Sequence, residues 1–148
     1  MAAGLTLREA SLPLFETEFA HEVERWIDED TLAGHLHTDG ELLAGEFNVG
    51  TAEALREGGP WGSGFPEPLF DGDFGVAETR VVGQRHLKLK LRAVSGEVIE
   101  AIAFRYLDGA DAPEIRANDR VTAVYRTGVD DYTGTRKLQL VIEWVGKL

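Results

Sequence analysis

The sequence predicts a mainly β protein (α+β overall), in which a five-stranded barrel follows an amphipathic helix and a short connector. Apolar residues recur at three- and four-residue steps over residues 12–30, which is the period of a helix. Residues 59–68 are rich in Gly and Pro, and beyond them apolar and polar residues alternate in short runs, as in strands. We therefore expect three segments: a helical arm over residues 1–34, a connector with a short strand and a short helix over residues 35–59, and the barrel over residues 60–148.

The helix of the arm is expected over Leu12–Asp30. Ser11 is a suitable N-cap, and Pro13 is tolerated in a first helical turn. One apolar stripe runs along this helix, formed by Leu12, Phe15, Phe19, Val23, Trp26 and Ile27. Most of the remaining positions are acidic. We interpret this acidic face as solvated, and the alternative is a docking site for a basic partner.

The connector is expected to hold two short elements. The turn pair Asp39–Gly40 leads into a short strand around Glu41–Leu43. A short helix over Thr51–Arg56, capped by its first residue, ends at Gly58–Gly59–Pro60.

The Gly- and Pro-rich loop that follows carries two aromatic residues, Trp61 and Phe65. Its prolines and glycines exclude a helix or a central strand, so we expect a loop of defined shape. The two rings either fill a structural niche or form a contact point for a partner protein.

Five strands with turn signals between them are expected after this loop: Gly75–Val82, His86–Arg92, Val98–Phe104, Arg120–Arg126 and Leu138–Val145. Five short strands, with one longer connection between the third and the fourth, are typical of a small closed barrel. The OB-fold is the commonest five-stranded barrel, and an SH3-like barrel is the alternative.

Composition limits the classes of protein further. The 148 residues contain no Cys, which excludes disulfides and thiolate metal sites and favours a reducing compartment. No apolar run approaches the roughly 20 residues that cross a bilayer, and the N-terminus lacks a signal-peptide pattern. We therefore expect a cytoplasmic protein that does not bind membranes.

The formal net charge of −11 argues against a nucleic-acid-binding protein until it is divided along the chain. Residues 1–70 hold 3 Arg and 14 acidic residues, which is a balance of −11, whereas residues 71–148 hold 12 basic and 12 acidic residues. Between Arg80 and Arg92 there is no acidic residue at all. A local basic patch can bind phosphates on an acidic protein, because salt screens distant charges over about 10 Å.

The strand over His86–Arg92 concentrates this basic charge. Its leucines alternate with His86, Lys88, Lys90 and Arg92, so four basic or potentially basic side chains share one face. Their spacing of about 6–7 Å is close to that of phosphates in an extended single strand. The alternative is a solvated strand face on which Lys protects an edge.

The last hairpin adds an aromatic residue to this basic region. Tyr132 lies in its loop, with Arg136 and Lys137 at the exit, and an exposed Tyr beside such cations can stack on a base. The alternative is a Tyr132 that packs beneath its own loop. The candidate nucleic-acid-binding residues are therefore Arg80, Arg85, His86, Lys88, Lys90, Arg92, Arg126, Tyr132, Arg136 and Lys137.

Catalytic motifs are missing from the sequence. His35, His37 and Asp39 would be needed for a metal site, but the spacing shows no further ligand, and a pair of surface residues explains the His-x-His pattern. There is no Walker loop, no GxSxG motif and no dinucleotide-binding GxGxxG. We therefore assign no catalytic and no metal-binding residue, and an independent hydrolase is the least favoured function.

Several segments together match the pattern of one known family: Pro60–Phe70, Val82–Gly83, His86–Lys88, Ala101–Phe104, Tyr125, Tyr132–Gly134 and Leu138–Leu140, with Ala2–Gly4 and the helix Leu12–Asp30 at the other end. In these segments the sequence resembles the C-terminal region of the RecJ family. One departure is Asp131, where relatives often have Asn.

The resemblance implies a function in DNA repair and recombination. RecJ proteins are single-strand-specific 5′-to-3′ DNA exonucleases of the DHH phosphoesterase superfamily, and they use Mn²⁺ or Mg²⁺ held by Asp and His residues of the DHH domain. None of those motifs is in this sequence, so the chain itself is expected to need no cofactor. The resemblance makes residues 1–34 the end of the DHH-associated domain and residues 60–148 an OB domain that binds single-stranded DNA.

Two functions therefore remain in view. The first is a module that binds single-stranded DNA through the basic strand and the last hairpin. The second is a protein-interaction module, in which the acidic helix or the loop of Trp61 and Phe65 docks the nuclease core or a partner such as a single-strand-binding protein or a helicase.

Overall fold

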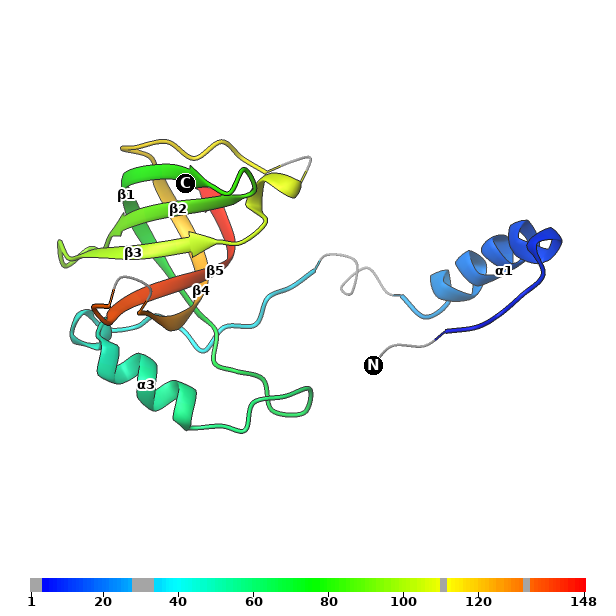
Figure 1. Ribbon diagram of the computed structural model, residues 1–148, viewed down its shortest axis with the longest axis horizontal. Coiled ribbons are helices and arrows are strands. Elements are labelled where there is room, and N and C mark those ends of the chain that lie inside the picture. The colour runs from blue at the N-terminus through cyan, green and yellow to red at the C-terminus, as the bar shows by residue number, and fades with distance from the viewer. Residues whose placement is uncertain (1–3, 28–33, 110–111, 132–133) are drawn as a thin grey trace. The chain divides into compact units, whose positions relative to one another are not determined.

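The computed structural model describes residues 4–27, 34–109, 112–131 and 134–148. The chain divides into two compact units, residues 1–36 and residues 37–148. Figure 1 shows a helix in the first unit and a barrel with a helix beside it in the second. Among the described residues, no helix is both long enough and apolar enough to cross a membrane.

The first unit contains α1, which spans Leu12–Glu24. It ends before the predicted Asp30, and positions 28–30 lie outside the described residues. Ser11 makes no capping hydrogen bond, because it belongs to a 3-10 turn over Glu9–Ser11 instead. The apolar stripe is present, and Phe15 stacks on Phe19 with ring centroids 5.5 Å apart. No residue of α1 is buried.

The second unit begins with residues that the sequence analysis treats as a connector. The predicted strand at Glu41–Leu43 does not form, and a 3-10 helix over Ala44–Glu46 follows an extended segment. This segment is held to the barrel by backbone bonds, one from Asp39 N–H to Leu69 O (2.7 Å) and one from Asp71 N–H to Gly40 O (3.2 Å). These two hydrogen bonds fix the position of the segment, but they do not form a continuous β-ladder.

Helix α3 spans Val49–Glu57 and begins two residues earlier than predicted. Its cap is Asn48 rather than Thr51, because the Asn48 side chain accepts a hydrogen bond of 2.9 Å from the Thr51 N–H. Leu42, Phe47 and Leu55 pack against the barrel core. The residues before the Gly- and Pro-rich loop therefore cover one end of the barrel.

The barrel consists of β1 (Phe70–Val82), β2 (His86–Arg92), β3 (Val98–Ala103), β4 (Arg120–Asp130) and β5 (Lys137–Lys147). It is closed in the order β1-β2-β3-β5-β4, with β3 and β5 parallel and all other pairs antiparallel. This is the OB arrangement, so the SH3-like alternative is wrong. Strand β1 begins five residues before the predicted start, because Phe70–Gly75 pairs with β4 despite its unfavourable Asp and Gly residues.

The core confirms the predicted alternation in β2. Leu87, Leu89 and Leu91 are buried, so the intervening basic side chains lie outside the barrel. Tyr125 of β4 occupies the centre of an aromatic cluster, within 6.3 Å of the ring centroids of Phe47, Phe70 and Phe74. Its hydroxyl is buried and has no hydrogen-bond partner among the described residues.

Replacing Tyr125 tests this packing. We expect Tyr125→Phe to change the free energy of unfolding by less than about 1 kcal/mol, because it removes a buried hydroxyl that is not hydrogen-bonded. Tyr125→Ala should lose about 3–5 kcal/mol, since it leaves a large cavity. Urea denaturation of the 148-residue chain measures both values.

The free energy of unfolding of the parent chain and of Tyr125→Phe should differ in its dependence on pH. Burial raises the pKa of the Tyr125 phenol, so the folded chain favours the protonated form. The stability that this group contributes is present below the ordinary Tyr pKa of about 10 and is lost as the pH rises above it. Tyr125→Phe should therefore lose less stability than the parent in that range, and an equal loss would contradict the burial of the phenol.

Candidate nucleic-acid interface

The outer face of β2 lies between two strands that each contribute an acidic residue. Lys90 is directly opposite Glu78 of β1 and Glu100 of β3. Its Nζ lies 2.5 Å from Oε2 of Glu78. The hydrogen bond and the opposite charge raise the pKa of Lys90 and lower that of Glu78. Lys90 is therefore paired with Glu78, which is twelve positions away in the sequence and is brought beside it by strand pairing.

Lys88 is also paired across the sheet. Its Nζ lies 3.0 Å from Oε2 of Glu100 and 3.7 Å from Oδ2 of Asp130 at the end of β4. The Lys88 side chain is only 28% exposed. Gln139 of β5 donates a hydrogen bond of 3.4 Å to the same oxygen of Asp130. These contacts join four strands on one side of the barrel.

Arg80 of β1 lies directly opposite Lys88, which places two like charges side by side. Such a pair is unfavourable in an antiparallel sheet unless an opposite charge lies between its members. Arg80 forms no ion pair within the described part of the chain, although it is close enough to Glu78 to contribute to the lowered pKa of that carboxyl. Arg80 is therefore an exposed cation beside a half-buried lysine that is already paired with carboxylates of other strands.

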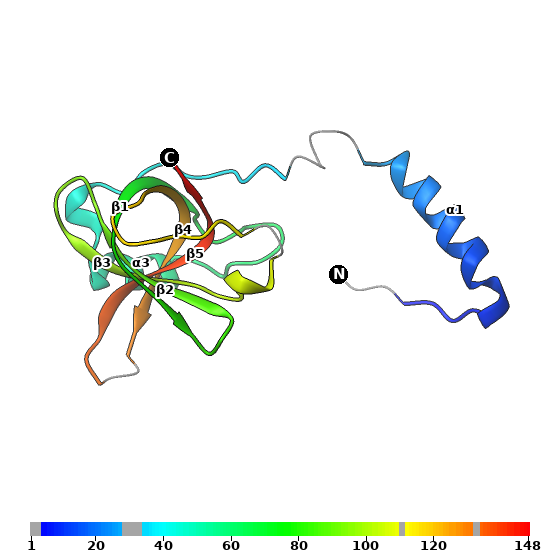
Figure 2. The same ribbon diagram turned by 90° about the horizontal axis from the view of Figure 1, so that it is seen from above.

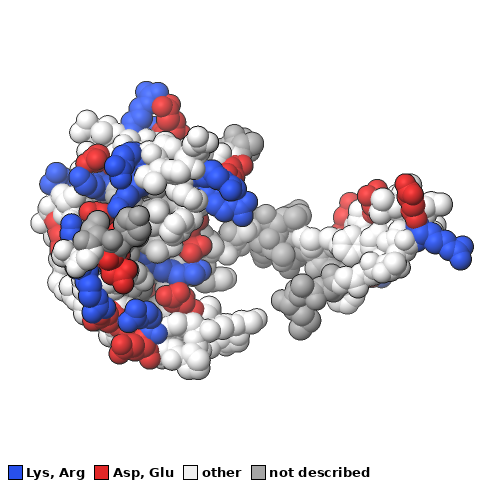
Figure 3. Space-filling model, in the orientation of Figure 1, with Lys and Arg blue, Asp and Glu red and all other residues white. Residues whose placement is uncertain are grey.

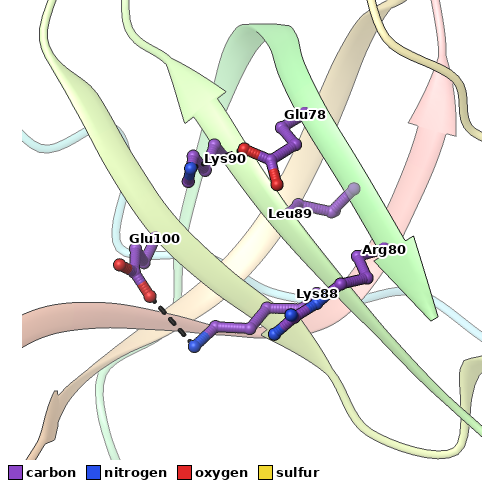
Figure 4. A pocket seen from close by; sticks show the side chains of 6 residues that line it. All are labelled: Glu78, Arg80, Lys88, Leu89, Lys90 and Glu100. Carbon is purple, nitrogen blue, oxygen red and sulfur yellow. Dashed lines mark hydrogen bonds and ion pairs between the residues drawn. The ribbon is translucent and has the colours of Figure 1, made fainter. Parts of the chain in front are cut away.

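These side chains line a shallow hollow of about 230 Å³. Figure 4 shows its six lining residues, with Lys88 reaching toward Glu100, Arg80 beside Lys88, and Glu78 beside Lys90. Leu89 forms the floor from within the barrel wall. The hollow is thus lined by three cations and two carboxylates: Arg80, Lys88 and Lys90 with Glu78 and Glu100.

Two more of the predicted residues lie where the β1–β2 turn enters β2: Arg85 in the turn and His86 at the start of the strand. Arg85 forms a bidentate pair with Asp108, at 2.9 and 2.5 Å, and Arg105 reaches the same carboxylate at 2.8 Å. His86 Nδ1 accepts a hydrogen bond of 2.9 Å from the Arg105 N–H. The His86 ring also meets the ring of Phe104 edge to face, at 5.4 Å.

The remaining predicted residues do not gather with these. Arg126 pairs with Glu67 (3.7 Å) and Glu143 (3.2 Å), beside a hollow that Trp61 and Phe65 also line. Arg136 pairs with Glu53 of α3. Arg92 has a long contact of 3.5 Å to Gly96 O in the β2–β3 turn.

Two positions of the last hairpin complete the comparison with the predicted set. Lys137 is exposed at the start of β5, opposite Asp130. Tyr132 lies outside the described residues. The basic side chains of β2 therefore share one outer face, as predicted. Lys88 and Lys90 on this face are paired with carboxylates from other strands. Figure 3 shows the consequence, with basic and acidic side chains intermingled over the barrel surface.

Two hairpins flank this surface. In Figure 2 the β1–β2 hairpin and the β4–β5 hairpin extend beyond the barrel on the same side. The outer face of strands 2 and 3 together with these two hairpins is where OB barrels bind oligonucleotides.

Sequence analysis missed one aromatic candidate on this surface. Phe104 directly follows β3, is 57% exposed, and is fixed by its contact with His86. It was missed because it was assigned to the end of a strand, where the alternation does not show whether a ring is covered.

The loop of Trp61 and Phe65 has a mixed character. Trp61 Nε1 donates a hydrogen bond of 3.0 Å to Leu55 O at the end of α3, and its ring packs on Phe65 at 4.8 Å. A Cβ on Gly59 would lie 2.5 Å from the Trp61 ring, so only Gly permits this approach. Trp61 thus has a structural role, whereas Phe65 remains 57% exposed.

The structure gathers no metal-binding group in the residues it describes: nowhere in them do three or more His, Asp or Glu side chains come together as ligands. His37 and Asp39 lie near the Trp61 loop instead, and an Asp39 carboxylate oxygen accepts a hydrogen bond of 3.0 Å from the Leu69 N–H.

The closed barrel, its strand order and its flanking hairpins define this class of protein as an OB-fold domain preceded by a helical arm. Comparison with known proteins identifies the particular family. The model of the RecJ OB domain matches residues 38–144. The single-stranded-DNA-specific exonucleases RecJ of Dickeya dadantii and Escherichia coli are 42% and 40% identical over 144 residues. The chain therefore belongs to the RecJ family.

The match covers only part of those relatives. The two alignments include 97% of this chain and 25% of each relative, so the chain spans about a quarter of their length. A crystal structure of RecJ from Thermus thermophilus in complex with Mn²⁺ matches with a TM-score of 0.64 and 19% identity, over 98% of this chain and 20% of that one. This structural match supports the fold.

The carboxylate of Asp108 offers a direct test of the geometry of the β1–β2 turn. Hydrogen bonds from Arg85 and Arg105 hold its pKa well below its usual range. An NMR pH titration should show this displaced midpoint, and Arg85→Gln should move it upward toward the ordinary Asp value of about 3.9. A midpoint that is already ordinary in the parent chain would contradict the bidentate pair.

Proposed function

We propose that this chain is the single-stranded-DNA-binding OB portion of a RecJ-like 5′-to-3′ exonuclease, a cytoplasmic enzyme of DNA repair and recombination. In this proposal residues 1–34 are the end of the DHH-associated domain. The catalytic Mn²⁺ or Mg²⁺ ions are held by the part of the enzyme that corresponds to the remaining length of the relatives. The described residues of this chain bind the substrate and do not cleave it.

One observation carries the proposal. Arg80 and Lys88 are cross-strand neighbours of like charge, and both line the hollow on the outer surface of β1 and β2. A phosphodiester between them would accept charge-assisted hydrogen bonds from both side chains, and such bonds to phosphate are strong for both Arg and Lys. Contacts to phosphate do not depend on the base sequence, because they are made to the DNA backbone. Such binding suits an exonuclease, which must act on any sequence.

Exposed aromatic rings at the same surface would hold the bases. Phe104 is available to stack at the β1–β2 end of the hollow, where it is held by His86. Stacking of a base on an aromatic side chain is worth about 1–3 kcal/mol and does not depend on the base. Tyr132, in the neighbouring hairpin, is proposed as a second stacking position, as the sequence predicts.

The alternative function is a protein-interaction module. The observation that favours it is the exposure of Phe65 on a ring pair that Trp61 anchors to α3. In this alternative the loop, or the acidic face of α1, docks the nuclease core, a single-strand-binding protein or a helicase. Loss of partner binding in a folded Phe65→Ala chain, with DNA binding unchanged, would support it.

Charge reversal on β2 tests the proposed function. Lys88→Glu and Lys90→Glu should each weaken binding of a fluorescently labelled oligothymidylate about tenfold or more, because each replaces a phosphate contact by a repulsive charge. Each should also reduce the dependence of log Kd on log salt, by a fraction of the roughly 0.7 that one full phosphate contact contributes on a single strand. Fluorescence anisotropy over a series of salt concentrations measures both quantities.

Lys147→Glu is the matched control for these variants. It makes the same charge change on β5, where Lys147 pairs with Asp119 at 2.9 Å. We expect it to bind nearly as the parent does. Equal losses in all three variants would show a general charge effect, and no binding of single strands by the parent would contradict the proposal.

A further inference from the structure

We infer that Glu78 and Glu100 compete with DNA phosphates for Lys90 and Lys88 and thereby weaken the grip of this surface on single strands. The inference rests on the proposed function and assigns a role to two acidic residues. In a surface evolved only for tight binding, carboxylates beside the phosphate-binding cations are unfavourable. Here both carboxylates line the hollow beside the lysines.

The geometry shows that the competition is local to each cation. Glu78 lies on β1 and Glu100 on β3, so the two carboxylates flank β2 from opposite sides in one cross-strand row with Lys90. Each takes a different lysine: Glu78 holds Lys90 at 2.5 Å and Glu100 holds Lys88 at 3.0 Å. A phosphate that approaches either Nζ therefore competes with a carboxylate oxygen already in contact with it, and Asp130 lies 3.7 Å from the Lys88 Nζ as well.

Partial exposure makes this exchange possible. The Lys90–Glu78 side chains are 47% and 55% exposed, and those of Lys88–Glu100 are 28% and 31% exposed. Water therefore reaches each carboxylate once its lysine turns toward DNA. Exposed ion pairs are worth only a fraction of the energy of buried ones, so the exchange costs little. The ion pairs also restrict the lysine side chains while no DNA is present, which limits the side-chain entropy lost on binding.

The exchange has a characteristic salt dependence. Salt weakens a lysine–phosphate contact, but it weakens a lysine–carboxylate contact as well. Exchanging a lysine–carboxylate contact for a lysine–phosphate contact is therefore less sensitive to salt than forming a phosphate contact from a free lysine. Binding should be moderate in strength and shallow in its salt dependence, which suits a surface along which a strand must advance as it is shortened.

The test removes the two carboxylates without changing the size of the side chains. Relative to the parent chain, Glu78→Gln and Glu100→Gln should each tighten binding of labelled oligothymidylate about two- to fivefold, and the double variant should show both gains. The double variant should also have a steeper plot of log Kd against log salt, by up to about 0.7 for Lys90 and by less for Lys88, which keeps its contact of 3.7 Å with Asp130.

A double Glu57→Gln and Glu97→Gln variant is the control for net charge. Both of its positions are exposed, and neither lines the hollow. We expect this control to bind as the parent does, and thermal unfolding of all variants to show that the fold is retained. An equal gain in the control would show that overall charge, not local competition, is responsible, and would overturn the inference.

The remaining outcomes separate the inference from the proposed function. Binding by the parent with unchanged affinity and salt slope in the Glu78→Gln and Glu100→Gln variants overturns the inference alone. Absence of binding in the parent and in the double variant overturns the proposed function and the inference together.

Discussion

The register of β2 between β1 and β3 decides which charged side chains meet on the outside of the barrel. Leu87, Leu89 and Leu91 point inward, and a slip of one residue would expose all three and bury the lysines between them. Burial of each leucine is worth about 1.5–3 kcal/mol. The opposition of Arg80 and Lys88 costs at most about 1 kcal/mol in such a sheet. The core therefore imposes this charge arrangement on the surface.

The same constraint places an acid on each side of Lys90 and sets Arg80 beside Lys88. One hollow thus combines two lysines that are paired with carboxylates and one exposed arginine. The net charge of the whole chain, −11, does not predict this local arrangement of charges. What a phosphate meets is set by side chains within a few ångströms, and these come from strands that are separated in the sequence.

Sequence analysis predicted the strands and the face of β2 because period-two alternation is a local property. It failed at element boundaries. Phe70–Gly75 joins β1 through its ladder with β4, and Asn48 rather than Thr51 caps α3. It also predicted an acid-free basic strand, because Glu78 precedes the basic run and Glu100 follows it in sequence, and only strand pairing brings them to Lys90 and Lys88. Arg126 and Arg136 were included in the site for the corresponding reason, since nearness in sequence to the last hairpin says nothing about which barrel face they occupy.

The central claim is that single-stranded DNA lies across the outer face of β1, β2 and β3. The most direct measurement is a titration of the isotope-labelled chain with unlabelled oligothymidylate, followed by the backbone amide NMR signals. The account predicts saturable shifts that are largest at Glu78–Arg80, His86–Lys90 and Glu100–Phe104. Shifts confined to α1 or to the loop of Trp61 and Phe65, with these strands unaffected, would contradict it.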